Sequence, residues 1–465
     1  MAEHQYDLVV VGGGPGGYTA AIRAAQLGMR VGIIEREKLG GICLNWGCVP
    51  TKALLKNAEV LHAFRKADEW GITFDNLQFD FGKVIKRSRG IADRISKGVE
   101  FLMKKNKVDT IYGYARLETA GRLEVRMEGK PATTVSARHI VLATGARPRS
   151  LPGVAFDRAR ILTSTEAMSL AHQPTTMVIV GAGAIGIEFA YFYNALRTKV
   201  TVVEMLPGIL PVEDRELTRL LENSLKKQGI EILTGTRVEN VRSGSKDVTV
   251  SVTTPEGKRD LKGDVALLAV GVQGNVENIG LEDLGVAVDR GHIVVDRDYR
   301  TSVEGVYAIG DVIGPPWLAH VASAEGIHCA EAIAGRQPEA IDYTSIPGCT
   351  YCQPQIASVG LTEEKALAEG HELKIGRCQF RPMGKAMAIG ESEGMVKLIF
   401  DAKYGELLGA HIMGSEATEM IAELVVAKKL EITGQKLLRI THAHPTLSEA
   451  VMEAAAAAYG EAINI

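Results

Sequence analysis

Cys43 and Cys48 lie close together in the segment GGICLNWGCVPTK, residues 40–52. They are about one and a half helical turns apart, so a helix start between them would bring the two sulfur atoms within disulfide range. A disulfide across so short a loop adds little stability through chain entropy, and a redox role therefore accounts for the pair better than a structural one. The alternatives are two buried thiols or half of a metal site. Because no second pair follows at zinc-finger distance, a four-sulfur zinc site is disfavoured.

A candidate acid–base pair lies near the end of the chain, where His444 is followed by Glu449 across a turn and then by an alanine-rich helix. A histidine base with an orienting carboxylate fits this spacing. The alternatives are a surface histidine at a helix start, or a His-x-His zinc site formed with His442. The zinc site is disfavoured because no further ligand is evident, and no metal is expected. Cys349 and Cys352, in a β-type pattern over residues 346–359, are interpreted as small strand side chains.

A glycine-rich turn precedes the cysteine pair. The apolar run 8–11 predicts a buried strand, residues 18–27 predict a helix that ends at Gly28, and residues 31–34 predict a second strand with Glu35 at its end. Gly12, Gly14 and Gly17 occupy the G-x-G-x-x-G positions between the first strand and the helix. Such glycines let the backbone approach a pyrophosphate at the helix N-terminus, and the acidic residue can hold a ribose diol. The segment therefore predicts dinucleotide binding.

The same unit recurs at residues 176–204, with glycines at Gly181, Gly183 and Gly186 and an acid at Glu204. Two such units imply two different dinucleotides, or one duplicated domain that kept its site. A carboxylate at position 204 accepts from a ribose 2′-OH and repels a 2′-phosphate, which favours NAD(H) over NADP(H). Arg197 stands where the first unit has a glycine. Because a left-handed conformation costs a non-glycine residue about 1 kcal/mol, we expect this loop to be built differently.

The remaining elements position these motifs. Helices are expected over 47–70 and 81–106, the second with an apolar face typical of a scaffold helix. Short strands are expected over 109–135, and buried strands ending in turns over 140–145 and 265–271, while residues 225–300 are strand-rich. A further strand leads to Asp311, which could accept from polyol hydroxyls or serve as a turn residue. His320 is interpreted as a helix-start residue, not a catalyst.

Composition limits the class of protein. A chain of 465 residues predicts two to four domains, and 46% hydrophobic with 23% charged residues is typical of a globular protein. A net charge of −3 gives no reason to expect nucleic-acid binding, and no apolar run reaches the length of a membrane span. The chain begins with neither a basic leader nor an apolar signal segment. With six cysteines, a cytoplasmic location is expected, where a disulfide would be catalytic.

Together these motifs, with the sequences ATGARP, AIGD and HPTLSE, resemble the pyridine nucleotide–disulfide oxidoreductase family over essentially the whole chain. Within the family the resemblance is to the dihydrolipoamide dehydrogenase branch. It implies an α/β fold, with two Rossmann-like FAD/NAD-binding domains and a C-terminal α+β dimerisation domain. The implied domains are residues 1–150 for the first half of the FAD domain, 151–280 for the NAD domain, 281–345 for a central domain that completes the FAD site, and 346–465 for the interface.

The resemblance also implies cofactors and their residues. FAD would be bound by Gly12, Gly14, Gly17, Glu35, Lys52, Gly113, Ala115, Thr144, Gly145, Asp311, Leu318, Ala319 and His320. NAD would be bound by Gly181, Gly183, Ala184, Ile185, Gly186, Glu204, Val238, Val270 and Gly271. Glu188 resembles the family residue that pairs with Lys52 beside the flavin.

The implied reaction is oxidation of protein-bound dihydrolipoamide. His444, oriented by Glu449, would act as the base, the substrate thiolate would attack Cys43, and Cys48 would lie nearer the flavin, which reduces NAD+. His444 would come from the second subunit of a homodimer. The implied partners are lipoyl domains of 2-oxo-acid dehydrogenase acyltransferases or the glycine cleavage H protein, and they must belong to other chains because no lipoyl-type domain precedes Tyr6.

The chain departs from the family's usual sequence at three places. The family's usual G-R-x-P-N continuation is replaced over residues 272–275, Trp317 stands where methionine is more frequent, and residues 380–386 form a variant strand.

Glutathione reductase relatives are one competing activity. They prefer NADP(H), which Glu204 disfavours. Mercuric reductase and large thioredoxin reductase relatives carry extra C-terminal cysteines, whereas no cysteine follows Cys378 in this chain. Transhydrogenase-like members lack the cysteine pair that this chain has at positions 43 and 48. A non-enzymatic alternative is a flavin-bound scaffold for a multienzyme core.

Overall fold

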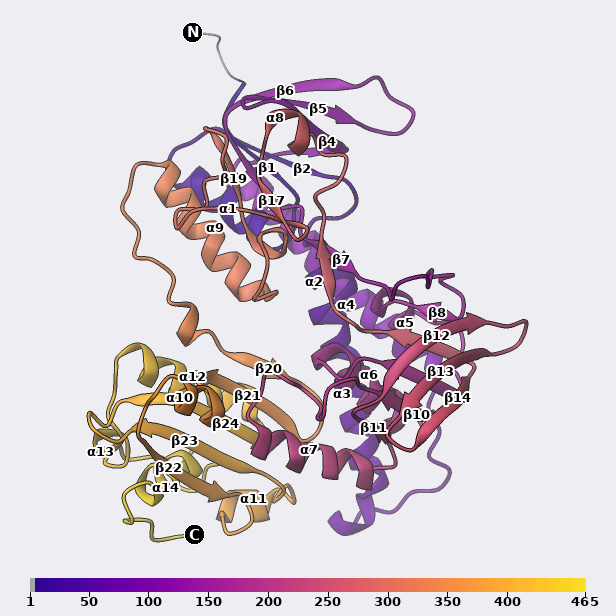
Figure 1. Ribbon diagram of the computed structural model, residues 1–465, viewed down its shortest axis with the longest axis vertical. Helices are drawn as coiled ribbons and strands as arrows, with labels where there is room; N and C mark the ends of the chain where they lie inside the picture. The colour runs from indigo at the N-terminus through magenta and orange to yellow at the C-terminus, as the bar shows by residue number, and fades with distance from the viewer. Residues whose placement is uncertain (1–4) are drawn as a thin grey trace. The chain divides into compact units, whose positions relative to one another are not determined.

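The computed structural model describes residues 5–465 (Figure 1). The first four residues, where the absence of a leader was expected, lie outside the described residues. Contacts divide the chain into two compact units. Unit 1 comprises the chain up to Leu54, Asp80–Arg149 and Gly271–Ile341, and unit 2 comprises Leu55–Phe79, Ser150–Val270 and Asp342–Ile465. No helix in the described part of the chain is both long and apolar enough to cross a membrane.

Unit 1 is built on a sheet whose parallel centre confirms the predicted strand–helix–strand segment with the first glycine turn. Its central strand β1 (Tyr6–Val11) pairs in parallel with β2 (Val31–Glu35) on one side and β6 (Thr133–Leu142) on the other. The apolar run 8–11 is fully buried, as expected for a parallel strand that is covered on both faces. The flanking strands are β3 (Asp109–Tyr112), β4 (Tyr114–Thr119), β5 (Arg122–Arg126) and β19 (Val306–Ala308).

Helices cover this sheet. The glycine turn leads into α1 (Pro15–Gln26), which lies beside α9 (Ala319–Ile333) (Figure 1). The two helices can approach closely because Gly326 has no side chain. A Cβ at this position would lie 2.5 Å from the carbonyl oxygen of Gly16. The remaining elements of this unit include α2 (Gly41–Trp46), the start of α3 (Cys48–Arg65), α4 (Phe81–Lys105), β7 (Ala146–Pro148), β16 (Val272–Gly274), α8 (Leu281–Leu284), β17 (Val288–Asp289), β18 (His292–Ile293) and a 3-10 turn at Gly310–Ile313.

Unit 2 repeats this arrangement, which confirms the predicted second unit. Its parallel sheet has the strand order β11 (Glu231–Leu233), β10 (Lys199–Val203), β9 (Thr176–Val180), β15 (Val265–Leu268) and β8 (Ile161–Leu162). Beside it runs an antiparallel sheet of β12 (Arg237–Ser243), β13 (Val248–Thr254) and β14 (Gly257–Gly263). The helices of this part are α5 (Ser164–Ala167), α6 (Ala184–Ala195) and α7 (Arg215–Lys227).

The expectation for the loop at Arg197 was wrong. Arg197 adopts a left-handed backbone with φ 71°, and its counterpart Gly28 has φ 89°. The turn hydrogen bonds also correspond, since the amides of Gly28 and Arg197 each donate to the carbonyl three residues earlier, at 3.0 and 2.8 Å. The loop is therefore built in the same way, and the arginine bears the strain, about 1 kcal/mol, that the glycine avoids.

The C-terminal part of unit 2 is an antiparallel sheet with helices on it. Its strand order is β20 (Gly348–Thr350), β21 (Gln355–Gly360), β24 (Leu407–Gly414), β23 (Met395–Asp401) and β22 (Leu373–Gln379). The helices are α10 (Glu363–Ala368), α11 (Gly384–Ala388), α12 (Ala417–Lys429), α13 (Gly434–Leu437) and α14 (Glu449–Ala457). Buried apolar side chains from β22, β23, β24, α12 and α14 form one core. The predicted α/β fold with an α+β C-terminal region is therefore confirmed.

The two cysteines of the later C-x-x-C were predicted to be strand residues, and this is correct for one of them. Cys349 lies in β20, whereas Cys352 lies in the turn before β21, where it is buried and its thiol donates to the Pro354 carbonyl at 3.1 Å. The cis peptide bond before Pro354 belongs to this turn, which interrupts the β-type pattern.

Candidate active site

The structure places the two N-terminal cysteines at the junction of two helices in unit 1. Cys43 lies in the short helix α2 and Cys48 is the first residue of α3. Their thiol groups lie within hydrogen-bond reach of each other, so the two sulfur atoms are close enough to form the predicted redox disulfide. Gly47 lies between the helices, and a Cβ there would come within 3.0 Å of the Ile42 carbonyl oxygen. A side chain at position 47 would therefore push the two cysteines apart.

Close backbone contacts hold the dithiol helix against the first glycine turn. The amide of Gly40 donates to the carbonyl of Gly13 at 2.7 Å. A Cβ on Gly41, which has φ 56°, would lie 2.7 Å from the Cα of Gly14. Asn45 is buried and its amide donates to the carbonyls of Leu39 and Gly41, at 3.1 and 3.0 Å. The glycines that predict dinucleotide binding therefore also position the sulfur chemistry.

Electrostatics distinguish the two thiols. The hydrogen bond with Cys48 and burial raise the pKa of Cys43, while the positive charge of Lys52 opposes them. Cys48 lies at the N-terminus of the 18-residue helix α3, where the helix dipole favours a thiolate. This asymmetry is what a reaction needs in which one sulfur is attacked and the other is released as the thiolate.

Both glycine turns are constructed so that the first helical turn faces outward. Gly14 and Gly183 cap α1 and α6; a Cβ on Gly14 would meet only the Cα of Gly41, at 3.9 Å, and a Cβ on Gly183 would meet nothing within 4 Å. In contrast, a Cβ on Gly17 or Gly186 would lie 1.9 or 2.0 Å from the carbonyl at the start of its own turn. These contacts fix the turn, and the exposed amides at the helix start are available to a phosphate.

The two predicted acids occupy equivalent positions. Glu35 accepts from the amide of Gly13 at 2.7 Å and from that of Glu37 at 2.8 Å. Glu204 accepts from the amides of Ala182 and Leu206, both at 2.8 Å. Each carboxylate thus ties the glycine turn to the end of the next strand, a structural role that the motif alone did not predict. Its remaining lone pairs can accept from a ribose.

Asp311 and Thr144 lie at the same sheet edge as the first glycine turn, because β1, β6 and β19 are parallel neighbours that end there. Burial raises the pKa of Asp311 from 3.8 to about 6. Its backbone is held in place by Glu325, a residue that the sequence did not single out, which is buried and accepts from the Gly310 amide at 2.7 Å. Thr144 donates to the carbonyl of Asn275 at 2.9 Å, and Asn275 donates back to Thr144 at 2.8 Å.

This exchange explains the atypical segment 272–275. Residues 272–274 form β16, which pairs antiparallel with β7 of the ATGARP segment, and the neighbouring Arg147–Glu277 ion pair, at 2.6 Å, also connects the two segments. The other predicted unit 1 residues are accounted for as follows. Gly113 joins β3 to β4, Ala115 is buried in β4, Gly145 is a turn glycine, Leu318 caps α9, Ala319 and His320 begin it, and Gly271 accepts from the Arg149 amide.

Unit 2 holds the second set of predicted residues. Ala184 and Ile185 begin α6, Val238 lies in β12, and Val270 follows β15. Glu188 is buried in α6 and accepts from the Tyr351 amide at 3.0 Å. This contact connects the second glycine helix to the turn after β20, and it was not predicted.

The terminal histidine and glutamate form the predicted pair, also in unit 2. Nδ1 of His444 lies 2.9 Å from Oε1 of Glu449, and the histidine side chain is 79% exposed. The hydrogen bond from the Thr446 amide and the interaction with His444 lower the pKa of Glu449, which outweighs burial. An ionised Glu449 holds the proton on Nδ1 and leaves Nε2 free of it. His442 forms a separate pair with Glu423 at 2.7 Å, which raises the pKa of His442.

Comparison with known proteins decides the family. Residues 6–326 match the model described as pyridine nucleotide-disulphide oxidoreductase, and residues 346–455 match the dimerisation domain of the same family. The chain belongs to the pyridine nucleotide-disulphide oxidoreductase family. The match to the dimerisation domain supports a homodimer.

Relatives of this family chain are similar over their full length. It is 49% identical to a dihydrolipoyl dehydrogenase of Rhizobium etli and 47% identical to one of Zymomonas mobilis, with 100% of each chain covered. The crystal structure of LpdA from Mycobacterium tuberculosis has a TM-score of 0.90 at 28% identity, covering 96% of this chain and 98% of that one. The flavoprotein disulfide reductase RclA from Escherichia coli has a TM-score of 0.88 at 26% identity, covering 98% and 99%.

Members of the family use FAD and NAD(H), and the described residues fit both cofactors. The turns at Gly14 and Gly183 leave room at two helix starts for two pyrophosphates. Asp311 is a desolvated carboxylate at the edge where β1, β6 and β19 end, a place for it to accept from ligand hydroxyls.

Proposed function

We propose that this chain oxidises dihydrolipoamide and passes the electron pair to NAD+. The observation that carries the proposal is the presence of the Cys43–Cys48 dithiol in a chain that is 43–49% identical, over its full length, to dihydrolipoyl dehydrogenases from several bacteria. The preference for NAD+ over NADP+ is supported by Glu204, whose negative charge opposes a 2′-phosphate.

The sulfur steps are assigned to four residues. Nε2 of His444 takes a proton from one thiol of the substrate, and Glu449 stabilises the imidazolium that forms. The substrate thiolate attacks Cys43 of the oxidised pair, which breaks the Cys43–Cys48 disulfide and releases Cys48 as a thiolate at the start of α3. The second substrate thiol then displaces Cys43 and leaves its proton there, so that lipoamide departs with its disulfide closed and the enzyme holds the Cys43 thiol, the Cys48 thiolate and a protonated His444. FAD held at the first glycine turn would supply the two-electron transfer from this reduced pair to NAD+.

The other residues serve binding. Lys52 and Glu188 are proposed as a pair beside the flavin, and Val238, Val270 and Gly271 as the adenosine wall. The proposed domains are residues 1–150 and 281–345 for FAD, residues 151–280 for NAD, and residues 346–465 for the dimer interface. Lipoyl domains of 2-oxo-acid dehydrogenase acyltransferases or the glycine cleavage H protein are proposed as partners, and the cytoplasmic location expected from the sequence stays a prediction.

An assay of the purified flavoprotein tests the proposal. NADH formation should require dihydrolipoamide and NAD+, and it should be far slower when NADP+ replaces NAD+. Glutathione disulfide with NADPH is the control for a glutathione reductase, and mercuric ion with NADPH is the control for a mercuric reductase. Turnover of either control substrate above that of lipoamide with NADH would contradict the proposed substrate.

A further inference from the structure

A cavity of about 450 Å³ in unit 2 is unrelated to any residue assigned above. It is lined by the end of α3, the end of α6 and the start of β10, and by the residues after α7. Its lining residues are His62, Arg65, Tyr191, Asn194, Ala195, Arg197, Thr198, Lys199, Gln228 and Gly229. A cavity of this size is large enough for a small organic ligand.

The lining is cationic. It contributes Arg65, Arg197 and Lys199, with His62 as a titratable neighbour, and none of the ten side chains is acidic. The carboxylates that act on lining residues come from outside the lining: Glu59 and Glu391 act on Tyr191, Glu69 acts on His62, and Glu231 acts on Lys199. Burial and the nearby positive charge of Arg197 lower the pKa of Arg65.

Two buried polar atoms of the lining are unsatisfied. Nε of Arg65 and the hydroxyl of Tyr191 are buried, and neither has a hydrogen-bond partner within the described residues. Buried donors without partners are unfavourable in a finished fold and usually mark a missing ligand, ion or water. Both atoms belong to residues that line this cavity.

Basic residues at helix C-termini also stabilise the helix dipole, without any ligand. The helices α3, α6 and α7 all end at the cavity, and each C-terminus carries a partial charge of roughly −0.5. Three such ends amount to roughly −1.5, against three full positive charges from Arg65, Arg197 and Lys199. The helix dipoles therefore do not account for all of the positive charge in the lining.

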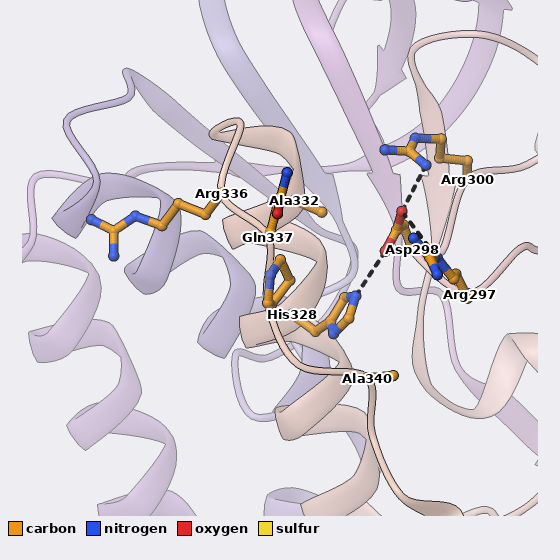
Figure 2. A pocket seen from close by; sticks show the side chains of 9 residues that line it. Arg297, Asp298, Arg300, His328, Ala332, Arg336, Gln337 and Ala340 are labelled. Carbon is orange, nitrogen blue, oxygen red and sulfur yellow. Dashed lines mark hydrogen bonds and ion pairs between the residues drawn. The ribbon is translucent and has the colours of Figure 1, made fainter.

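A second cavity, in unit 1, differs in having a carboxylate among its cations (Figure 2). It has a volume of about 360 Å³, and its lining includes Arg297, Arg300 and Arg336. There Asp298 lies between Arg300, at 2.8 Å, and His328, at 3.1 Å, so a carboxylate of the chain itself already pairs with one of the arginines. The cavity of unit 2 lacks such a residue in its lining.

Arg197 brings a full positive charge to this cavity from a position where the first glycine-turn helix ends in a glycine. Its backbone holds the left-handed conformation that Gly28 also holds, and its exposed side chain lines the cavity.

We propose that this cavity binds a small phosphate-bearing anion, held by Arg65 and Arg197. Lys199 begins β10, whereas the glycine turn at Gly181 follows the end of the parallel strand β9. The cavity therefore lies at the N-terminal ends of these parallel strands, whereas the dinucleotide turn lies at their C-terminal ends. Five residues of strand separate the two ends by roughly 15 Å. It would be a second anion site, available while NAD is bound.

Calorimetric titration of the FAD-loaded protein tests the proposal, with saturating NAD+ present to occupy the dinucleotide turn and chloride added to hold ionic strength constant. Pyrophosphate, inorganic phosphate and AMP are the probes, and the comparison of the last two separates free phosphate from a phosphate ester. At least one probe should bind wild-type protein, and Arg197→Gly and Arg65→Gln should each weaken that binding at least tenfold.

Arg197→Gly is informative because glycine suits the turn, so this variant should melt no lower than wild type. Arg158→Gly is the matched control, since Arg158 is also left-handed, at φ 57°, lies in the same unit and does not line the cavity. It should bind the probe as wild type does. Absence of binding by all three probes to wild type, or unchanged affinity in Arg197→Gly, would overturn the proposal.

Discussion

Oε1 of Glu449 lies 2.9 Å from Nδ1 of His444, while Oε2 of the same carboxylate accepts from the Thr446 amide at 2.8 Å. The glutamate is therefore fixed by the backbone and in turn fixes the imidazole. This arrangement makes Nε2 the atom that accepts a proton.

His444→Ala should lower the rate of flavin reduction by dihydrolipoamide by roughly 10²- to 10⁴-fold, the usual contribution of a general base. Oxidation of NADH by an artificial electron acceptor, which bypasses the sulfur chemistry, should change little. Stopped-flow absorbance can follow both half-reactions. His371→Ala is the control, because His371 also contacts a carboxylate, Asp401 at 3.2 Å, in the same unit. Equal loss in both half-reactions would mean that His444 is structural.

Asp311→Asn should weaken FAD binding roughly 10- to 100-fold, since a hydrogen bond from a ligand hydroxyl to a carboxylate contributes about 1.5–3 kcal/mol. The apoprotein should respond in the opposite direction. The folded-state pKa of Asp311 is raised from 3.8 to about 6, so its contribution to stability is fully present below pH 3.8 and is lost as the pH rises through 6.

At pH 7.5 the Asp311→Asn apoprotein should therefore melt at or above the temperature of wild type, while FAD titrations by fluorescence quenching show the weaker binding. Asp289→Asn, at an exposed position of the same unit, is the control and should change neither value. A variant that melts lower without FAD would contradict the assignment of Asp311 as a ligand-directed carboxylate.

Glu204→Gln should raise the efficiency of NADPH relative to NADH roughly tenfold or more, because removal of a like charge near a 2′-phosphate is worth several kcal/mol. One amide contact, to Ala182 or Leu206, can survive the change, so the turn should persist. Glu35→Gln makes the equivalent change in the first unit and should reduce FAD content without altering the preference between nicotinamides. If the ratio of kcat/KM values stays constant in Glu204→Gln, the selectivity argument fails.

Lys397 carries the strongest stability prediction. Its side chain is 2% exposed, and Nζ lies 2.9 Å from Asp214, 3.0 Å from Glu216 and 2.7 Å from Glu363. Lys397→Met leaves the buried Asp214 carboxylate without its partner, which should reduce stability by about 3–5 kcal/mol. Thermal unfolding should show this loss, and the exposed Lys403→Met should serve as a neutral control.

The same pair predicts a pH dependence. Burial alone would raise the pKa of Asp214, but the hydrogen bonds from Lys397 and the nearby His411 outweigh it, and the pKa falls below 3.8. The stabilisation is thus complete above pH 3.8 and lost as the pH falls through the lower, folded-state pKa. The difference between wild type and Lys397→Met should narrow below that pH. A difference that persists unchanged in acid would contradict this origin.

Local patterns made the parallel strands and glycine turns predictable, because the apolar run at 8–11 and the glycines after it determine both geometry and binding. The His444–Glu449 contact was also predictable, since only five residues separate the two side chains. Contacts across long sequence separations were not. Asp214 and Lys397 are 183 residues apart, and nothing in either local sequence indicates the partner.

The errors have physical reasons too. The expectation at Arg197 rested on local strain, which the fold tolerates because the turn hydrogen bonds are the same as those at Gly28. The additional task of Glu35 and Glu204, which is to hold the glycine turns, became visible only with the backbone amides of Gly13 and Ala182 in place.

The most direct test concerns Cys43 and Cys48 in the FAD-loaded protein. Air-oxidised protein and protein reduced anaerobically with one equivalent of NADH are treated with iodoacetamide, and each cysteine is quantified by mass spectrometry. Labelling of Cys43 and of Cys48 should be low before reduction and should rise after it, while labelling of Cys349 stays constant. Equal labelling of the two cysteines before and after NADH would contradict a disulfide that exchanges electrons with the nicotinamide.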